Sequence, residues 1–302
     1  MAGELVTTDG QIQWGNLLLG EGSPYAGRAL TGWDSLPDLD DGSTLRAQQH
    51  GSWPGQLLAR PRVLAFDFEL IPESQAADSS WPTYLAALRA ATTVAQDEQA
   101  LVIQLAGQRL LVMARVTRRI ITADQAFTWG HPKCAIEWTC SDPRRYEVNE
   151  QSTSAVLPTA ETGLSFGSPT ETGLSFGSPV ETGLNFGTAG ATGNMTIVNA
   201  GDTETYPVIE IRGPVTTPTV VLGSLRLEYA ITLGAADTLI VDTRAGTVTL
   251  GGQSRIHTAT ARSVVEGAFL LPPGTSTVSF RADPGSTDPA AQATVRWRSA
   301  YL

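Results

Sequence analysis

Residues 194–302 alternate short apolar stretches with turn residues about every ten positions. The stretches read MTIVNA, YPVIEIRG, TVVLG, LRLEYAI, DTLIVDT, GTVTLGG, STVSFRA and ATVRWRS, and no helical period is sustained among them. Gly246, Gly251 and Gly252 supply the positive φ angles that tight hairpins require. The pattern predicts an antiparallel β-sandwich, most simply a jelly roll.

The first half of the chain mixes strand patterns with loops. Residues 1–60 are rich in Gly, Pro and Asp and are expected to be mostly loop. Residues 62–71 alternate as a strand with one buried face. Residues 101–105 and 109–116 form a predicted hairpin with its turn at Gly107-Gln108, and residues 126–140 predict further strand.

The clearest helical pattern is WPTYLAALRAATTVAQ, residues 81–96. Pro82 suits a first helical turn. The remaining signals are a capping serine before the pattern and apolar residues at near-helical spacing: Ser79 or Ser80, then Leu85, Leu88 and Val94. One helix among many strands predicts a mainly β protein whose first domain, residues 1–150, is α+β.

A ten-residue unit occurs three times between these halves, at Glu161–Pro169, Glu171–Pro179 and Glu181–Gly187. Each unit places a Leu and a Phe two positions apart, on one side of an extended strand, before Gly or Pro interrupts it. Six apolar side chains therefore need a surface supplied by the flanking domains or by a neighbouring subunit: Leu164, Phe166, Leu174, Phe176, Leu184 and Phe186. We expect residues 151–193 to be a linker and docking arm, and residues 194–302 to be the second domain.

Charge and the length of apolar runs argue against a nucleic-acid binder, a membrane-spanning protein and a secreted protein. The net charge is −10, which disfavours a nucleic-acid binder but allows a protein that surrounds DNA without gripping it. No apolar run approaches the roughly 18 residues that a membrane span needs, and the start of the chain lacks the pattern of a secretory signal.

Two cysteines, Cys134 and Cys140, lie in the alternating stretch CAIEWTC. In a strand their Cα atoms are roughly 20 Å apart, far beyond the approximately 7 Å limit of a disulfide. The sequence predicts two free thiols and assembly in a compartment that is reducing or redox-indifferent.

Candidate catalytic and metal-binding chemistry is weak. His50, His131 and His257 are isolated, and the acidic turn at 38–41 lacks the closing Glu of a calcium loop because Gln49 occupies that position. No nucleophile elbow, phosphate loop or dinucleotide fingerprint occurs. We expect no catalytic, metal-binding or cofactor-binding residues, and no enzyme.

Six of the seven tryptophans fall in the first half of the chain. Trp33 and Trp53 lie in predicted loops, where tryptophan often anchors a protein interface. The alternative for each is half-buried packing within its own domain. A Trp-rich and loop-rich first domain favours contacts with other subunits.

The second half resembles the C-terminal part of distal tail (Dit) proteins of siphophages, especially those of actinobacterial phages. The resemblance is carried by Asn199–Gly201, Tyr206–Pro214, Asp237–Leu250, Leu271–Phe280 and Val295–Leu302. Short Gly-Leu-x-Phe units commonly precede this domain in that family, although Ser-Pro or Thr-Ala here follows each Phe-Gly where the family often has Phe-Pro. The first half is similar in the order of its elements.

The resemblance implies a structural protein of the virion, located at the tail tip or baseplate and assembled in the host cytoplasm. It implies a ring of six copies, closed by an N-terminal belt domain, with a galectin-like sandwich projecting outward. The expected partners are further copies of the chain, the tail tube protein, the tape measure protein and the tail-tip hub proteins. DNA passes through such a ring without specific binding.

Two other functions compete with this interpretation. The sandwich could bind a host cell-wall glycan, for which the available aromatic residues are Tyr206, Tyr229, Trp297 and Tyr301, although Tyr229 and Trp297 are equally plausible core residues. A tail-associated hydrolase is the third reading and has no motif in its support.

Overall fold

The structure is a computed structural model that describes residues 2–71, 81–159 and 191–302. The chain divides into two compact units: Met1–Asn149 together with Ser299–Leu302, and Glu150–Arg298. These boundaries differ from the expected ones at two places. Residues 151–156, expected in the linker, form a strand of the second unit, and the last residues of the chain return to the first.

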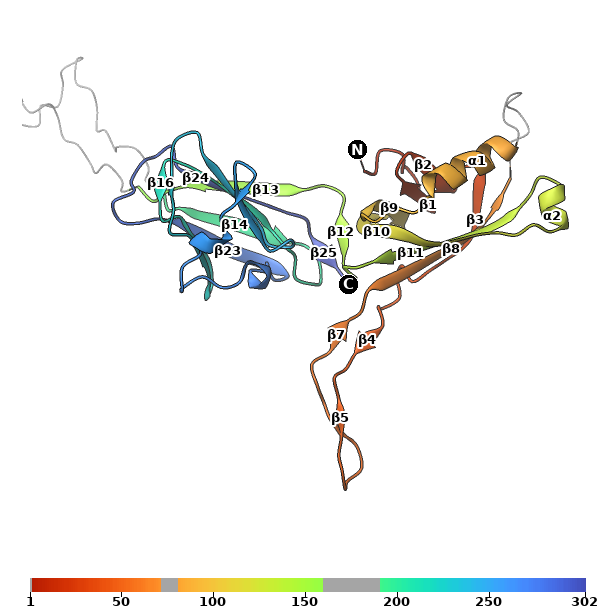
Figure 1. The fold of residues 1–302 in the computed structure, drawn as a ribbon, viewed down its shortest axis with the longest axis horizontal. Coiled ribbons are helices and arrows are strands. Elements are labelled where there is room, and N and C mark those ends of the chain that lie inside the picture. The colour runs from red at the N-terminus through yellow and green to blue at the C-terminus, as the bar shows by residue number, and fades with distance from the viewer. Residues whose placement is uncertain (1, 72–80, 160–190) are drawn as a thin grey trace, which may run out of the picture. The chain divides into compact units, whose positions relative to one another are not determined.

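The first unit is built on an antiparallel sheet in the order β2-β1-β9-β10-β11-β8-β3, in which β12 pairs with β10, and β25 pairs with β12 (Figure 1). Its strands are β1 (Gln11–Trp14), β2 (Leu17–Gly20), β3 (Tyr25–Thr31), β8 (Arg62–Leu70), β9 (Gln99–Leu105), β10 (Gln108–Ile121), β11 (Lys133–Cys140), β12 (Arg145–Glu147) and β25 (Ala300–Tyr301). The long strand β10 pairs with β9 along its first half and with β11 along its second, with a bulge between Val116 and Arg118.

Several strand predictions are confirmed, and two are wrong. β8 buries every second side chain, as its alternation predicted, and β9 and β10 form the predicted hairpin, turning at Ala106 and Gly107, which both have positive φ. Residues 1–60 are not mostly loop, because their short apolar runs form β1, β2 and β3. Residues 126–132 are not strand: α2 (Gln125–Thr128) lies there, capped by Asp124, which accepts a hydrogen bond from the Phe127 amide at 3.0 Å.

The predicted helix is α1 (Trp81–Ala91), and it buries Leu85 and Leu88. Two hydrogen bonds attach it to strands: Trp14 Nε1 donates to the Ala91 carbonyl at 2.8 Å, and the Tyr25 hydroxyl donates to the Tyr84 carbonyl at 2.8 Å. Val94 is not part of it. The helix ends three residues earlier and Val94 is 92% exposed. The predicted capping serines, Ser79 and Ser80, lie outside the described residues.

The core of the first unit is aromatic and contains both thiols. Trp138 is fully buried and lies 5.9 Å from the ring of Trp14. Cys134 and Cys140 are free and lie near the beginning and at the end of β11, as predicted, and both are buried. Burial raises the pKa of the Cys134 thiol to about 11 and that of Cys140 to about 12.

The second unit consists of two antiparallel sheets around one apolar core, which agrees with the predicted mainly β sandwich. The larger sheet has the order β13-β24-β15-β20-β21-β22, the smaller has the order β14-β23-β17-β18, and β16 pairs with β19. The glycines at 246, 251 and 252 have positive φ, as predicted. The elements of this unit are β13 (Gln151–Val156), β14 (Asn194–Asn199), β15 (Val208–Arg212), β16 (Val215–Thr216), β17 (Thr219–Leu222), β18 (Leu225–Glu228), β19 (Thr232–Leu233), β20 (Thr238–Asp242), β21 (Thr247–Leu250), β22 (Gln253–Ser254), β23 (Gly274–Arg281), β24 (Gln292–Trp297) and two 3₁₀ turns, Ile256–Thr258 and Glu266–Ala268.

Candidate interaction surfaces

A long hairpin leaves the sheet of the first unit between β3 and β8 (Figure 1). We call residues 34–61 the arm. Two short antiparallel pairs hold it together: β4 (Leu39–Asp40) with β7 (Leu58–Ala59), and β5 (Thr44–Leu45) with β6 (Ser52–Trp53). A two-stranded ribbon of this kind is marginal in isolation, since it has no sheet face on which to bury side chains.

The arm exposes an unusual share of large apolar side chains. Of the sixteen that are exposed in the described residues, six lie on the arm: Leu36, Leu39, Leu45, Trp53, Leu57 and Leu58. Leu45 is 83% exposed and Trp53 is 63% exposed, and both lie near its tip. Apolar surface concentrated on a projecting element is typical of a protein interaction site.

The arm tip carries a positive charge next to its tryptophan. The guanidinium of Arg46 lies 4.3 Å from the ring centre of Trp53, a cation–π contact. Arg46 has no carboxylate at ion-pair distance among the residues that the structure describes. The tip therefore presents an aromatic ring and an unpaired cation together.

The root of the arm is held by the buried side chain of Arg62, which is 1% exposed. Its Nη1 donates to the carbonyl oxygens of Gly32, Trp33 and Ser35 at 2.6, 3.0 and 2.7 Å. Its Nε donates to the Pro143 carbonyl at 2.8 Å. Because one rigid guanidinium binds three carbonyls of the segment that leads into the arm, it holds this segment against the first unit.

The structure separates the two tryptophans that the sequence proposed as interface anchors. Trp33 is 3% exposed and packs in the core of the first unit, with the guanidinium of Arg145 at 5.6 Å from its ring centre. Trp53 has most of its surface available. The arm leucines were missed by sequence reasoning, because they are scattered in a segment of Gly, Pro and Asp that shows no regular period. The six repeat residues Leu164, Phe166, Leu174, Phe176, Leu184 and Phe186 lie outside the described residues.

The first unit also contains a groove of about 340 Å³ where β2 and β3, the two ends of the sheet order, approach each other. A Cβ added at Gly27 of β3 would lie 3.8 Å from the Gly20 Cα of β2, so the strands meet through glycines. In the described chain β2 and β3 form no backbone ladder. The side chains of Leu30, Phe66 and Leu105 line the groove with apolar surface.

Charged groups accompany this apolar lining. Asp9, Glu21 and Arg28 also line the groove. Arg28 pairs with Glu69, and Asp9 accepts hydrogen bonds from the Gly107 amide. The carboxylate of Glu21 forms no ion pair with any described residue. The groove therefore combines an apolar lining with net negative charge.

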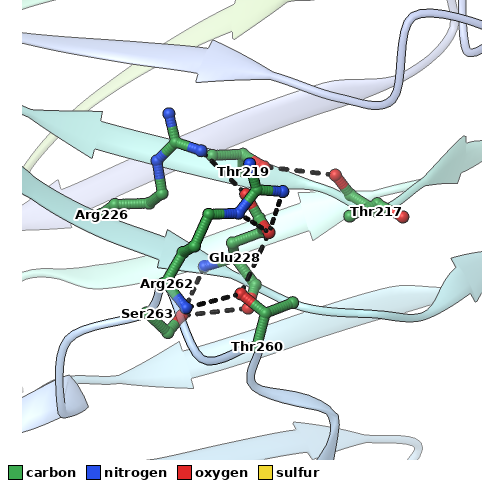
Figure 2. Close-up of polar contacts among 7 residues, drawn as sticks. All are labelled: Thr217, Thr219, Arg226, Glu228, Thr260, Arg262 and Ser263. Atoms are coloured by element: carbon green, nitrogen blue, oxygen red, sulfur yellow. Dashed lines mark hydrogen bonds and ion pairs between the residues drawn. The ribbon is translucent and has the colours of Figure 1, made fainter.

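The densest polar cluster of the second unit surrounds Glu228, at the end of the edge strand β18 (Figure 2). The side chain of Glu228 is 4% exposed and forms ion pairs with Arg226 at 2.9 Å and Arg262 at 2.8 Å. It also accepts a hydrogen bond from the Thr260 hydroxyl at 3.0 Å. Burial acts to raise the pKa of this carboxyl, but hydrogen bonds from Thr260, Arg226 and Arg262 outweigh it, and the pKa lies below its ordinary value.

This cluster holds a covering segment onto the edge of the sheet. The Thr260 amide donates to the Glu228 carbonyl at 2.9 Å, and the Val264 amide donates to the Arg226 carbonyl at 2.8 Å. Ser263 Oγ accepts from the Glu228 amide at 2.6 Å and donates to its carbonyl at 3.0 Å. Because the carboxylate already has three partners, the arrangement is suited to closing a sheet edge and not to binding a ligand.

The aromatic residues considered for glycan binding do not gather on one sheet face. Tyr229 and Trp297 are 0% and 5% exposed and belong to the core of the second unit. Tyr206 is half-buried in that unit, whereas Tyr301 lies in β25 of the first.

The described residues contain neither a cluster of metal ligands nor a membrane-spanning helix. Among the described residues, no group of three or more His, Cys, Asp or Glu side chains is placed to hold a metal ion. In the acidic turn, Asp41 accepts from Ser43 and Asp40 pairs with Arg60, as expected of a solvated turn. No described helix has the length and apolar character to cross a bilayer.

Comparison with known proteins links this fold to phage tails. No protein-family model and no curated protein matches the sequence. The fold is similar to the crystal structure of the Dit protein of phage SPP1, with a TM-score of 0.62 and 14% identity over 97% of this chain and 99% of that chain. That protein is described as a paradigm of the hub adsorption apparatus in phages that infect Gram-positive bacteria. A chain of the phage P2 baseplate in its activated conformation with calcium matches with a TM-score of 0.50 and 9% identity over 95% and 97% of the two chains. The fold of a distal tail protein, which the sequence resemblance implied, is thus present over almost the whole chain.

Proposed function

We propose that this protein is a structural component of a siphophage tail tip, where about six copies form a ring that joins the tail tube to the tail-tip proteins. The observation that carries the proposal is the shared fold with the SPP1 Dit protein, which extends over 97% of this chain and therefore includes both units. A match of this extent is informative because a common small sandwich alone would match one unit.

The surface of the first unit supports assembly with other copies. The arm exposes six large apolar side chains, and burying each is worth on the order of 1.5–3 kcal/mol before the costs of association are deducted. A ring of identical subunits needs two different patches on each subunit, so that each copy contacts two neighbours. The arm and the groove are two such patches.

The remaining parts of the proposal follow from this assembly. The protein acts without catalysis, as a connector between the tail tube, the tape measure protein and the tail-tip hub proteins in the virion. The net charge of −10 suits a ring through which DNA passes without binding. The six repeat side chains between residues 161 and 187 then pack on a flanking domain or on the next subunit.

Two measurements on the purified full chain test the proposal. Light scattering during size-exclusion chromatography is expected to give a mass near six times 31.9 kDa, and negative-stain images are expected to show annular particles. A monodisperse monomer at high concentration, with no annular particles, would overturn the ring. Cleavage of purified bacterial cell walls by the protein would overturn the non-enzymatic role.

A further inference from the structure

We infer that docking of strand β25 on β12 orders the arm root, residues 32–35, through the side chain of Arg145. With β25 in place, the guanidinium of Arg145 holds the arm root, and without β25 this hold is lost. The inference concerns the single chain and does not depend on the proposed ring. It makes the ordering of the arm root a consequence of completing the fold.

The side chain of Arg145 joins parts of the first unit that are far apart in the sequence. Its Nη1 donates to Asp34 Oδ1 at 3.0 Å, and its Nη2 donates to the Leu302 carbonyl at 3.0 Å. The guanidinium also lies 5.6 Å from the ring centre of Trp33, which is 3% exposed. One side chain therefore contacts the arm root and the segment that carries β25.

The guanidinium depends on both of these hydrogen bonds. The side chain of Arg145 is 13% exposed, and its Nε is buried without a hydrogen-bond partner among the described residues. A guanidinium is a rigid planar fork, so a bond at one terminal nitrogen sets the direction of the other. Loss of the Leu302 carbonyl would leave a second poorly hydrated donor, which favours another rotamer and releases Asp34.

Docking of β25 also fixes the backbone of Arg145. The antiparallel ladder pairs Arg145 with Tyr301. The Tyr301 hydroxyl donates to the Glu147 carboxylate at 3.3 Å, and the side chain of Ala300 is fully buried. Because the ladder and the bond to Leu302 act on the same residue, both the position and the orientation of its guanidinium follow from the docked strand.

Two arginines hold the arm root, and only one depends on the segment that follows the second unit. Arg62 binds backbone carbonyls of the arm root, and all its partners precede residue 150. Arg145 binds side chains of the arm root and needs Leu302, which follows the second unit in the chain. Synthesis runs from the N-terminus, so the second hold forms only after residues 150–298 have been made. A chain with an unfinished second unit thus lacks a fully ordered arm root.

Hydrogen–deuterium exchange of the dilute full-length chain tests this coupling. Proline at position 301 has no amide to donate to the ladder with Arg145. In Tyr301→Pro, exchange of the amides of residues 33–36, relative to those of β11, is expected to become about tenfold faster, the size typical of one hydrogen bond to a charged group. Tyr301→Val is the matched control, because it loses the same ring and hydroxyl but keeps the amide. Equal exchange at residues 33–36 in these two variants would overturn the inference.

Asp34→Asn tests the coupling in the opposite direction, since coupling between two parts of a protein is reciprocal. Weakening the hold of Asp34 on Arg145 is expected to speed exchange of the amides of residues 300–302 about threefold, as suits a partly exposed ion pair. Asp38→Asn is the control. Asp38 is an exposed residue of the same segment, and its carboxylate forms no ion pair with any described residue. The same exchange at residues 300–302 in both variants would refute the coupling.

A double variant tests whether the effect passes through Arg145. In a chain that already carries Arg145→Met, adding Tyr301→Pro is expected to change exchange at residues 33–36 by less than about twofold, because the two changes interrupt the same connection. A further tenfold increase would show that β25 acts on the arm root by another route and would overturn the role of Arg145.

Discussion

Replacing Arg62 by methionine removes four hydrogen bonds from the root of the arm while keeping a side chain of similar length. The guanidinium binds three carbonyls at 32, 33 and 35 through Nη1, and a fourth at Pro143 through Nε. Methionine fills the same space but donates none of these bonds, so the four carbonyl oxygens lose their partner.

The magnitude follows from two opposing terms. Hydrogen bonds to a charged group contribute about 1.5–3 kcal/mol each, which gives about 6–12 kcal/mol for four. Burying the guanidinium, which also lowers the pKa of Arg62, offsets several kcal/mol of this gain. We therefore expect Arg62→Met to lower the free energy of unfolding of the first unit by about 3–5 kcal/mol, within the range found for breaking buried polar networks.

Urea unfolding followed by tryptophan fluorescence measures this loss, because six of the seven tryptophans belong to the first unit. Arg60→Met is the matched control. Arg60 forms an exposed ion pair with Asp40, with side chains 59% and 57% exposed, and its replacement is expected to change stability by less than about 0.5 kcal/mol. If Arg62→Met unfolds at the same urea concentration as Arg60→Met, the buried guanidinium does not stabilise the arm root and the reasoning fails.

Three further predictions concern single sites. The folded-state pKa of Glu228 lies below its ordinary value of 4.5, so this carboxylate stabilises the fold above pH 4.5 and the stabilisation is lost as the pH falls through the folded-state pKa. Glu228→Gln is expected to remove this part of the acid sensitivity of the second unit. Identical acid-unfolding curves for the variant and the unmodified chain would contradict this prediction. Gly32→Ala is expected to lower the thermal midpoint by several degrees, because the new Cβ would lie 2.0 Å from the Val63 carbonyl at a backbone φ of +83°; an unchanged midpoint would be inconsistent with this geometry. Cys134 and Cys140 are expected to resist thiol reagents in the folded protein and to react in denaturant, since burial raises both pKa values; rapid labelling of the native chain would argue against their burial.

Local pattern predicted those elements that alternate buried and exposed side chains regularly, or whose partner strand is adjacent in the sequence. The alternation of residues 62–71 predicted β8, and the Ala106-Gly107 turn closes a hairpin between adjacent segments. Residues 1–60 were misjudged because β1 and β2 have only four residues each, and β1 finds its second partner, β9, some ninety positions later. Turn residues and short apolar runs look the same in a loop as in a small sheet until such a partner is known.

The candidate surfaces depended even more on tertiary structure. Trp33 and Trp53 lie in the same Gly- and Pro-rich segment, and nothing in their neighbours distinguishes the buried ring from the exposed one. The difference arises because Arg62 holds the chain around Trp33 against the first unit, whereas Trp53 lies beyond this anchor. In the groove, Gly20 of β2 lies next to Gly27 of β3. These two strands are the first and last of the sheet order, so the sequence alone does not show that they are close in space.

The return of β25 to the sheet of the first unit makes the second unit an insertion with both ends tethered. Gln151 pairs with Trp297, so the inserted segment starts and finishes on neighbouring strands. A module whose two ends lie together can be exchanged for another of similar end spacing without reshaping its host. The inserted module can therefore be replaced while the scaffold of the first unit is kept, whereas cutting the chain at a single linker would remove β25, the partner of β12.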